Sequence, residues 1–123
     1  SLRGEDKGNS ERGQIAERIN GFLERHGDSR FTDADHLDEQ RALLVRDRAG
    51  WWRDSSSVRV YLFTADGLRE ALKGFDFTRA LDTMQEVGLI GAPGADGKRA
   101  KFHRIHGRGM KLYVITPDQA GAV

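Results

Sequence analysis

The N-terminal part of the chain contains one helical hydrophobic pattern. Apolar residues recur three or four positions apart at Ile15, Ile19, Phe22 and Leu23. This is the spacing of one helix face, so we predict a helix from about Glu11 to His26, with Gly27 as a left-handed stop. Residues 1–10 are mostly polar or glycine, and this composition predicts a linker or disordered N-terminus.

The middle of the chain alternates between short apolar runs and turn residues. Three runs predict strands, namely Leu43 to Val45, Ala49 to Trp52 and Val58 to Phe63. The last two flank Asp54 and three serines, so we expect them to form a hairpin. Trp51 and Trp52 are neighbours on a strand and point to opposite faces, so one is expected to pack inward while the other faces out or meets a neighbouring element. The polar, acidic segment 33–41 favours a surface loop or a short helix.

Two short helices are predicted after residue 63. Thr64 and Asp76 are good N-cap residues, and each precedes a segment with apolar residues on one face. Gly74 and Gly88 follow these segments and can provide left-handed stops. Two short helices joined by a tight turn form a helix-turn-helix. A second hairpin is expected next, with strands at Ala100 to His106 and Met110 to Ile115 around a Gly107-Arg108-Gly109 turn.

This order of elements predicts an α+β fold, specifically a winged helix-turn-helix with an additional N-terminal helix and β-hairpin. We expect the winged-helix domain to cover residues 11–116, followed by a C-terminal tail over residues 117–123. A chain of 123 residues has room for one such domain. It contains no cysteine and no apolar run near the roughly 20 residues that cross a bilayer, which favours a cytoplasmic protein without membrane contact.

Positive charge is concentrated in the second hairpin. The net charge is only +1, yet six of the 20 lysines and arginines, and none of the 19 acidic residues, lie between residues 98 and 111. A local positive potential attracts a polyanion even when the whole molecule is nearly neutral. We therefore expect DNA phosphates to contact Lys98, Arg99, Lys101, Arg104, Arg108 and Lys111. The alternative is a solvated charged ribbon that only protects an edge strand.

The second short helix, over Phe77 to Val87, offers weaker candidates. Its outer side is expected to carry four residues that could reach bases, which are Thr78, Arg79, Thr83 and Gln85. Asp82 and Glu86 share that side and repel phosphate, so the hairpin is the main candidate and Arg79 is its best helper. An ordinary exposed helix face explains these residues equally well.

Known catalytic and metal-binding patterns are missing from the sequence. It contains no G-x-x-x-x-G-K-[ST], no G-x-S-x-G and no H-E-x-x-H. His103 and His106 are three apart in an extended segment, so they point to opposite faces and suit one metal ion poorly. We therefore expect a non-catalytic chain with no cofactor, no metal and no small-molecule substrate.

Several short runs in combination resemble one known family. The runs are Phe22-Leu23-Glu24-Arg25-His26-Gly27-Asp28-Ser29-Arg30-Phe31, Arg48-Ala49-Gly50-Trp51, Gly74-Phe75-Asp76, Gly97-Lys98 and Lys111-Leu112-Tyr113-Val114-Ile115. They resemble the C-terminal region of the primase-helicase proteins of plasmids, prophages and integrated islands, which include the Cch self-loading helicases. The resemblance covers nearly the whole chain after residue 10 and rests mostly on structural residues.

This resemblance implies that the chain is the C-terminal winged helix of a hexameric, ATP-driven helicase whose ATPase domain lies upstream. None of the motor's motifs falls within these residues, so no catalytic residue of the family is carried over. The expected partners are DNA, single- or double-stranded, and the ATPase domain of the same parent protein. Docking on the ATPase ring or on neighbouring subunits without DNA contact is the alternative, and the acidic remainder of the chain favours it. A stand-alone transcriptional regulator is a third interpretation, which the lack of an evident dimerisation helix disfavours.

Overall fold

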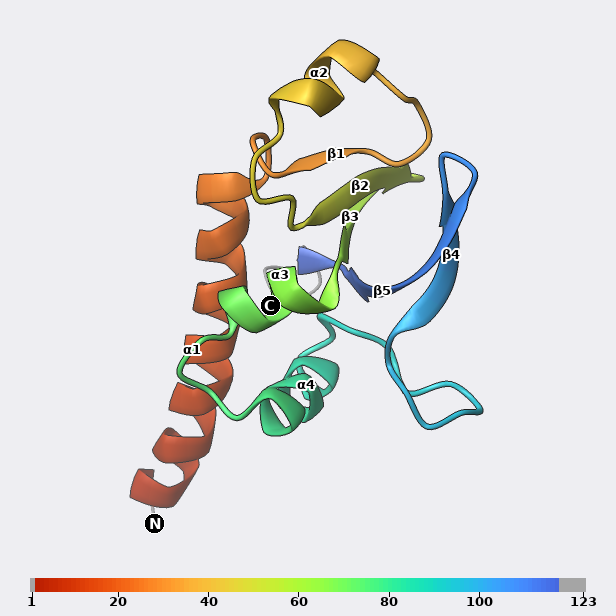
Figure 1. Ribbon diagram of the computed structural model, residues 1–123. Coiled ribbons are helices and arrows are strands. Elements are labelled where there is room, and N and C mark those ends of the chain that lie inside the picture. The colour runs from red at the N-terminus through yellow and green to blue at the C-terminus, as the bar shows by residue number, and fades with distance from the viewer. Residues whose placement is uncertain (1, 118–123) are drawn as a thin grey trace.

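The computed structural model describes residues 2–117, with side chains described from Ser10 onward. Helix α1 (Leu2–His26) lies beside a curved five-stranded sheet (Figure 1). The short helices α3 (Ala65–Ala71) and α4 (Phe77–Glu86) lie next to α1, and α2 (Glu39–Leu44) lies beyond β1 (Phe31–Asp33) in Figure 1. The α+β class is therefore as predicted, although α1 begins earlier than Glu11. The linker expected over residues 1–10 stays a prediction, because the side chains of residues 1–9 lie outside the described part. The expected tail also lies outside it, apart from residue 117.

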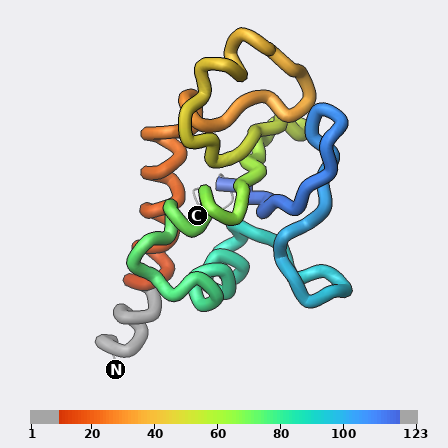
Figure 2. The backbone as a smooth tube through the Cα atoms, in the orientation of Figure 1, coloured from red at the N-terminus to blue at the C-terminus, as the bar shows by residue number. Residues whose placement is uncertain are grey.

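The sheet has the strand order β1-β2-β3-β5-β4. Its strands are β1 (Phe31–Asp33), β2 (Gly50–Ser55), β3 (Val58–Phe63), β4 (Lys101–Ile105) and β5 (Arg108–Ile115). β1 runs parallel to β2, and the other neighbouring strands are antiparallel. β5 changes partner along its length, since residues 108–112 pair with β4 and residues 113–115 pair with β3. The β4–β5 hairpin therefore curves away from β3, and its tip approaches β1 (Figure 2).

The two predicted hairpins are confirmed, and the turn of the second one shifts. Strands β2 and β3 pair over their full length around a turn in which Ser56 has a φ of 57°. In the second hairpin Ile105 pairs with Arg108, so the turn residues are His106 and Gly107, with φ of 50° and 83°. The expected Gly107-Arg108-Gly109 turn is thus wrong by one residue. Two residues with positive φ match the twist of the flanking strands.

The two predicted helices after β3 are confirmed together with their caps. α3 (Ala65–Ala71) follows Thr64, whose hydroxyl accepts a hydrogen bond from the Gly67 amide. α4 (Phe77–Glu86) follows Asp76, whose carboxylate accepts one from the Arg79 amide at 3.0 Å. These bonds satisfy amides at the start of each helix that have no intrahelical partner.

Two of the three glycines predicted as left-handed helix stops have that conformation. Gly74 and Gly88 have φ of 95° and 84°. Gly27 does not have a positive φ, and its amide donates to the Leu23 carbonyl 2.7 Å away, so the turn after α1 continues in helical form. The left-handed stop predicted at Gly27 is therefore wrong.

The strand predicted at Leu43 to Val45 is wrong. Leu43 and Leu44 end a short helix, α2 (Glu39–Leu44), which is capped by Asp38. Their exposed fractions are 78% and 77%, so this apolar run has no buried face of the kind that would hold it in a sheet. The acidic segment that precedes it forms a loop and the start of α2, as predicted, but also the end of β1, which was not predicted.

The sheet separates two hydrophobic cores, and the two adjacent tryptophans contact different ones. Trp52 packs against the larger core, which lies between the sheet and the helices α1, α3 and α4 and includes Phe31 and Phe63. Trp51 packs against the smaller core, on the opposite face, where Leu62 meets residues of the β4–β5 hairpin. Both side chains are therefore packed, which matches the expectation that one points inward and the other meets a neighbouring element. Within the described residues, no helix is long and apolar enough to cross a membrane.

Candidate nucleic-acid interface

The two faces of the β4–β5 hairpin differ in exposure. Successive residues of a strand alternate between faces, and residues that pair directly across the hairpin share one. The inner face contains the pairs Lys101–Leu112, His103–Met110 and Ile105–Arg108. Ile105 and Leu112 are buried there in the smaller core. The opposite side, which we call the outer hairpin face, contains Phe102, Arg104, Gly109 and Lys111, all of them exposed.

Three of the predicted phosphate contacts are exposed cations without an ion pair. Lys98, Arg104 and Arg108 form no ion pair with any side chain that the structure describes. Arg104 donates from Nη1 to the Gly107 carbonyl at 3.3 Å, which directs the guanidinium toward the hairpin tip. Arg108 follows the turn directly, and Lys98 precedes β4. These side chains can bind a phosphate without first breaking an existing ion pair.

Two of the six predicted cations pair with acids that lie outside residues 98–111. Lys111 Nζ is 3.6 Å from Asp96 Oδ2, and both side chains are about half exposed. The pKa of Asp96 lies below its ordinary value, mainly because the Lys98 amide donates to its carboxylate. Asp96 therefore stays charged at neutral pH. Exposed ion pairs of this kind contribute little because water screens them, so a phosphate can replace Asp96 beside Lys111.

Arg99 points to α4 instead of solvent. Its side chain is 14% exposed, and its Nη2 donates to Asp82 Oδ1 at 2.7 Å and to Gln85 Oε1 at 2.6 Å. Arg99 therefore ties the segment before β4 to the helix, and Gln85 is engaged by the same contact. Lys101 is also occupied, since its Nζ donates to the Ala92 carbonyl at 3.2 Å.

The outer side of α4 offers less than the sequence predicted. Thr83 is only 6% exposed, so its predicted place on that side is wrong. Thr78 and Arg79 are exposed, but Arg79 Nε lies 3.0 Å from Glu11 Oε1 of α1. α1 packs along α4, and this neighbour buries more of the helix than the apolar stripe alone indicates.

Phe102 was missed by sequence reasoning, which considered only the charges of this segment. It is a large aromatic residue with 62% of its surface exposed, on the same face as Arg104 and Lys111. The signal available in the sequence was the alternation Lys101-Phe102-His103-Arg104, which in a strand places Phe102 and Arg104 on one face. That pattern becomes informative only when the inner face is known.

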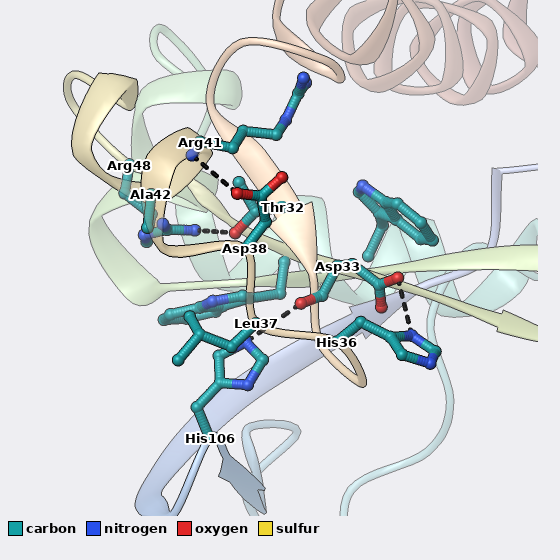
Figure 3. A pocket seen from close by; sticks show the side chains of 11 residues that line it. Thr32, Asp33, His36, Leu37, Asp38, Arg41, Ala42, Arg48 and His106 are labelled. Carbon is teal, nitrogen blue, oxygen red and sulfur yellow. Dashed lines mark hydrogen bonds and ion pairs between the residues drawn. The ribbon is translucent and has the colours of Figure 1, made fainter.

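The tip of the hairpin lies beside a pocket of about 270 Å³ between β1, α2 and β2. His106 Nε2 is 3.1 Å from the Asp33 carbonyl, and His36 Nδ1 is 3.1 Å from the Asp33 carboxylate. Figure 3 shows the two histidines reaching Asp33 from different segments. Arg48 lines the same pocket, and burial lowers its pKa from the ordinary value. Among the side chains described, no group of three or more histidines and acids could hold a metal ion.

No family model, no curated protein and no solved structure matches this chain. The resemblance to mobile-element primase-helicases therefore rests on the short sequence runs alone. Any functional conclusion has to come from the residues and their arrangement.

Proposed function

We propose that this chain is a winged-helix module that binds nucleic acid through phosphate contacts of the β4–β5 hairpin. The observation that carries the proposal is the set of exposed cations around the hairpin. Lys98, Arg104 and Arg108 have no ion pair among the described side chains, and Lys111 has only an exposed one. Phosphates attract such cations regardless of base sequence. In this proposal the chain itself has no catalytic role.

The order and pairing of the elements support a winged helix. The strand that precedes the two short helices is β3, and β5 returns from the hairpin to pair with it at residues 113–115. The helices α3 and α4 correspond to the helix-turn-helix, and β4–β5 corresponds to the wing. β1 and β2 are then additions that extend the sheet on the other side of β3.

The exposed acids of α4 and the engaged arginines near them favour contact with the nucleic-acid backbone over contact with bases. Asp82 and Glu86 are exposed on its polar side and would repel phosphates. The arginines on this side are already engaged, since Arg99 pairs with Asp82 and Arg79 pairs with Glu11. Glu86 itself pairs with Arg12 of α1 at 2.8 Å. Binding through the hairpin is therefore expected to depend weakly on sequence.

A salt titration with a labelled oligonucleotide tests this function. If Lys98, Arg104, Arg108 and Lys111 each contact one phosphate, log affinity should fall with log salt with a slope of about −3.6 on duplex DNA and about −2.8 on a single strand. The variant R104A/R108A should bind more weakly and reduce the slope by about 2 on duplex DNA. A control variant, R25A/R46A, removes the same charge from exposed positions on α1 and after α2.

Two results would overturn the proposal. One is undetectable binding at about 50 mM salt, where phosphate contacts are strong. The other is an equal loss in R104A/R108A and R25A/R46A, which would mean that only total charge matters. Far-UV circular dichroism of each variant keeps unfolding from being mistaken for lost contacts.

The family resemblance also suggests which larger protein contains this module. We propose that the module serves an ATP-driven helicase of a mobile element, with DNA and the ATPase domain of the same parent protein as its partners. The support is the set of short runs that resemble that family. An ATPase domain encoded directly upstream of residue 1 would support this context, and an unrelated upstream sequence would contradict it.

A second candidate function is docking on another protein, such as the ATPase ring that the resemblance implies. The observation that favours it is the exposed leucine pair of α2, since Leu43 and Leu44 are 78% and 77% exposed and Leu37 nearby is 56% exposed. Apolar side chains gathered on a surface often mark a protein interface. If this candidate is right, the variant L43S/L44S should lose the protein contact and keep its affinity for nucleic acid.

A further inference from the structure

We propose that Phe102 is a stacking platform for an unpaired base, so that the hairpin prefers single-stranded nucleic acid. This inference rests on the proposed function and specifies its ligand. Phe102 is exposed over 62% of its surface and stands on the outer hairpin face beside Arg104 and Lys111, two of the cations that the proposal uses. Every base has a flat π face, so an exposed ring can stack on it without reading its sequence.

The ring of Phe102 is held over the backbone of β5. A Cβ atom built on Gly109 would lie 2.6 Å and 2.7 Å from two atoms of this ring, so a larger residue there would displace the ring from its position. Gly109 does not have a positive φ, so its backbone conformation does not require glycine. A glycine inside a strand often marks a close approach of another group. Here that group is the Phe102 ring, which lies close to the β5 backbone at Gly109.

Cations lie on two sides of the ring. Lys111 pairs directly across from Phe102, and Arg104 is two residues further along β4 on the same face. Such neighbours lie about 5 Å and about 7 Å away in a sheet. A stacked base would therefore have a cation near the phosphate on either side. Asp96 is the acid that competes for Lys111, at 3.6 Å, and its pairing is exposed and easily replaced.

A purely structural role for Phe102 is the alternative, in which the ring only shields the Gly109 backbone. The leucine variant F102L separates the two roles, because leucine still covers the glycine but has no flat aromatic face. The tryptophan variant F102W should keep both roles, and its indole adds a fluorophore at the site. L44A is the matched control, since Leu44 is another exposed apolar residue, at 77% against 62% for Phe102, and lies on a different element.

The test uses the full 123-residue chain and two labelled 12-mers at one salt concentration. One is oligo-dT, and the other is an abasic strand with the same number of phosphates. The wild type and L44A should bind oligo-dT about 5- to 150-fold more tightly than the abasic strand, which is the usual contribution of one stacked base. F102L should bind both strands about equally, at the affinity that the wild type shows for the abasic strand.

The possible outcomes separate this inference from the proposed function. If F102L keeps the preference for oligo-dT, stacking on Phe102 is wrong, while binding of both strands leaves the proposed function intact. If the wild type binds neither strand at about 50 mM salt, the proposed function itself fails and the inference fails with it. If F102L does not fold, the F102W variant tests the inference. Oligo-dT should quench the fluorescence of the added tryptophan, and the abasic strand should not. An unchanged emission would overturn the inference.

Discussion

His106, at the tip of the β4–β5 hairpin, lies with its Nε2 3.1 Å from the backbone carbonyl of Asp33 at the end of β1. The two residues are 73 positions apart in the chain, so the contact links the hairpin tip to the far edge of the sheet. The inner face of the hairpin is packed as well, through Ile105 and Leu112. The hairpin is therefore held in place without a ligand, and binding need not order it first.

Removal of the His106 contact should affect the hairpin tip more than the rest of the protein. His106→Ala should increase hydrogen exchange of the β4–β5 amides near the tip, because the tether is removed. The free energy of unfolding should fall by no more than about 1 kcal/mol, since a single exposed hydrogen bond contributes little. The control is His36→Ala, which removes the other histidine contact with Asp33 and should leave hairpin exchange unchanged. Equal exchange in both variants and the wild type would contradict the tether.

Arg99 and Lys98 are adjacent cations with different expected roles. Arg99→Ala should lower the free energy of unfolding by about 1–2 kcal/mol, because it removes hydrogen bonds to Asp82 and Gln85 from a largely buried guanidinium. Lys98→Ala should change stability by less than about 0.5 kcal/mol, since its side chain is exposed and has no ion pair among the described residues. Urea denaturation of both variants measures the difference. Equal stability would show that the Arg99 contacts carry no net energy.

The partly buried ring of His103 should make the stability of the protein depend on pH. Its Nε2 is buried without a hydrogen-bond partner among the described residues, and its pKa lies below the ordinary 6.5, mainly because of burial and also because of the charge on Arg53. Below pH 6.5 the unfolded chain therefore binds a proton more readily than the folded one. Stability should thus be complete above that pH and decrease as the pH falls toward the folded-state pKa.

The variant His103→Gln tests this dependence. Its melting temperature should fall less than that of the wild type between about pH 7 and pH 5, and the other histidines are the same in both proteins. An NMR titration of the His103 ring should give a pKa below 6.5 in the folded state. Parallel melting curves over this pH range, or an unshifted ring titration, would contradict the prediction.

The predictions that succeeded depend on contacts between residues close in sequence. Thr64 and Asp76 cap their helices through amides three residues away, and Gly74 ends a helix by its own backbone conformation. The two hairpins are likewise local, because each pairs strands that are separated only by a short turn. Interactions of this range are written in a few consecutive residues, so a pattern is enough to identify them.

Two local predictions were also wrong, the stop at Gly27 and the turn of the second hairpin, but the larger errors occurred where distant segments meet. Thr83 is buried on α4, a helix that is joined to α1 through the pairs Arg79–Glu11 and Arg12–Glu86. Arg99 turns away from solvent because Asp82 lies on α4. Leu43 and Leu44 were read as a strand because they are apolar, although no part of the described sheet pairs with them. None of these environments can be deduced from neighbours in the chain.

The sequence by itself therefore determined that this chain is an α+β protein with capped helices and a hairpin rich in positive charge. The tertiary structure alone decided which of those charges are exposed, since acids from outside residues 98–111 pair with Arg99 and Lys111. It also decided that Phe102 is exposed, because the smaller core covers the other face of the hairpin. The physical reason is that charge and local geometry belong to consecutive residues, whereas burial and pairing depend on which distant segments the fold brings together.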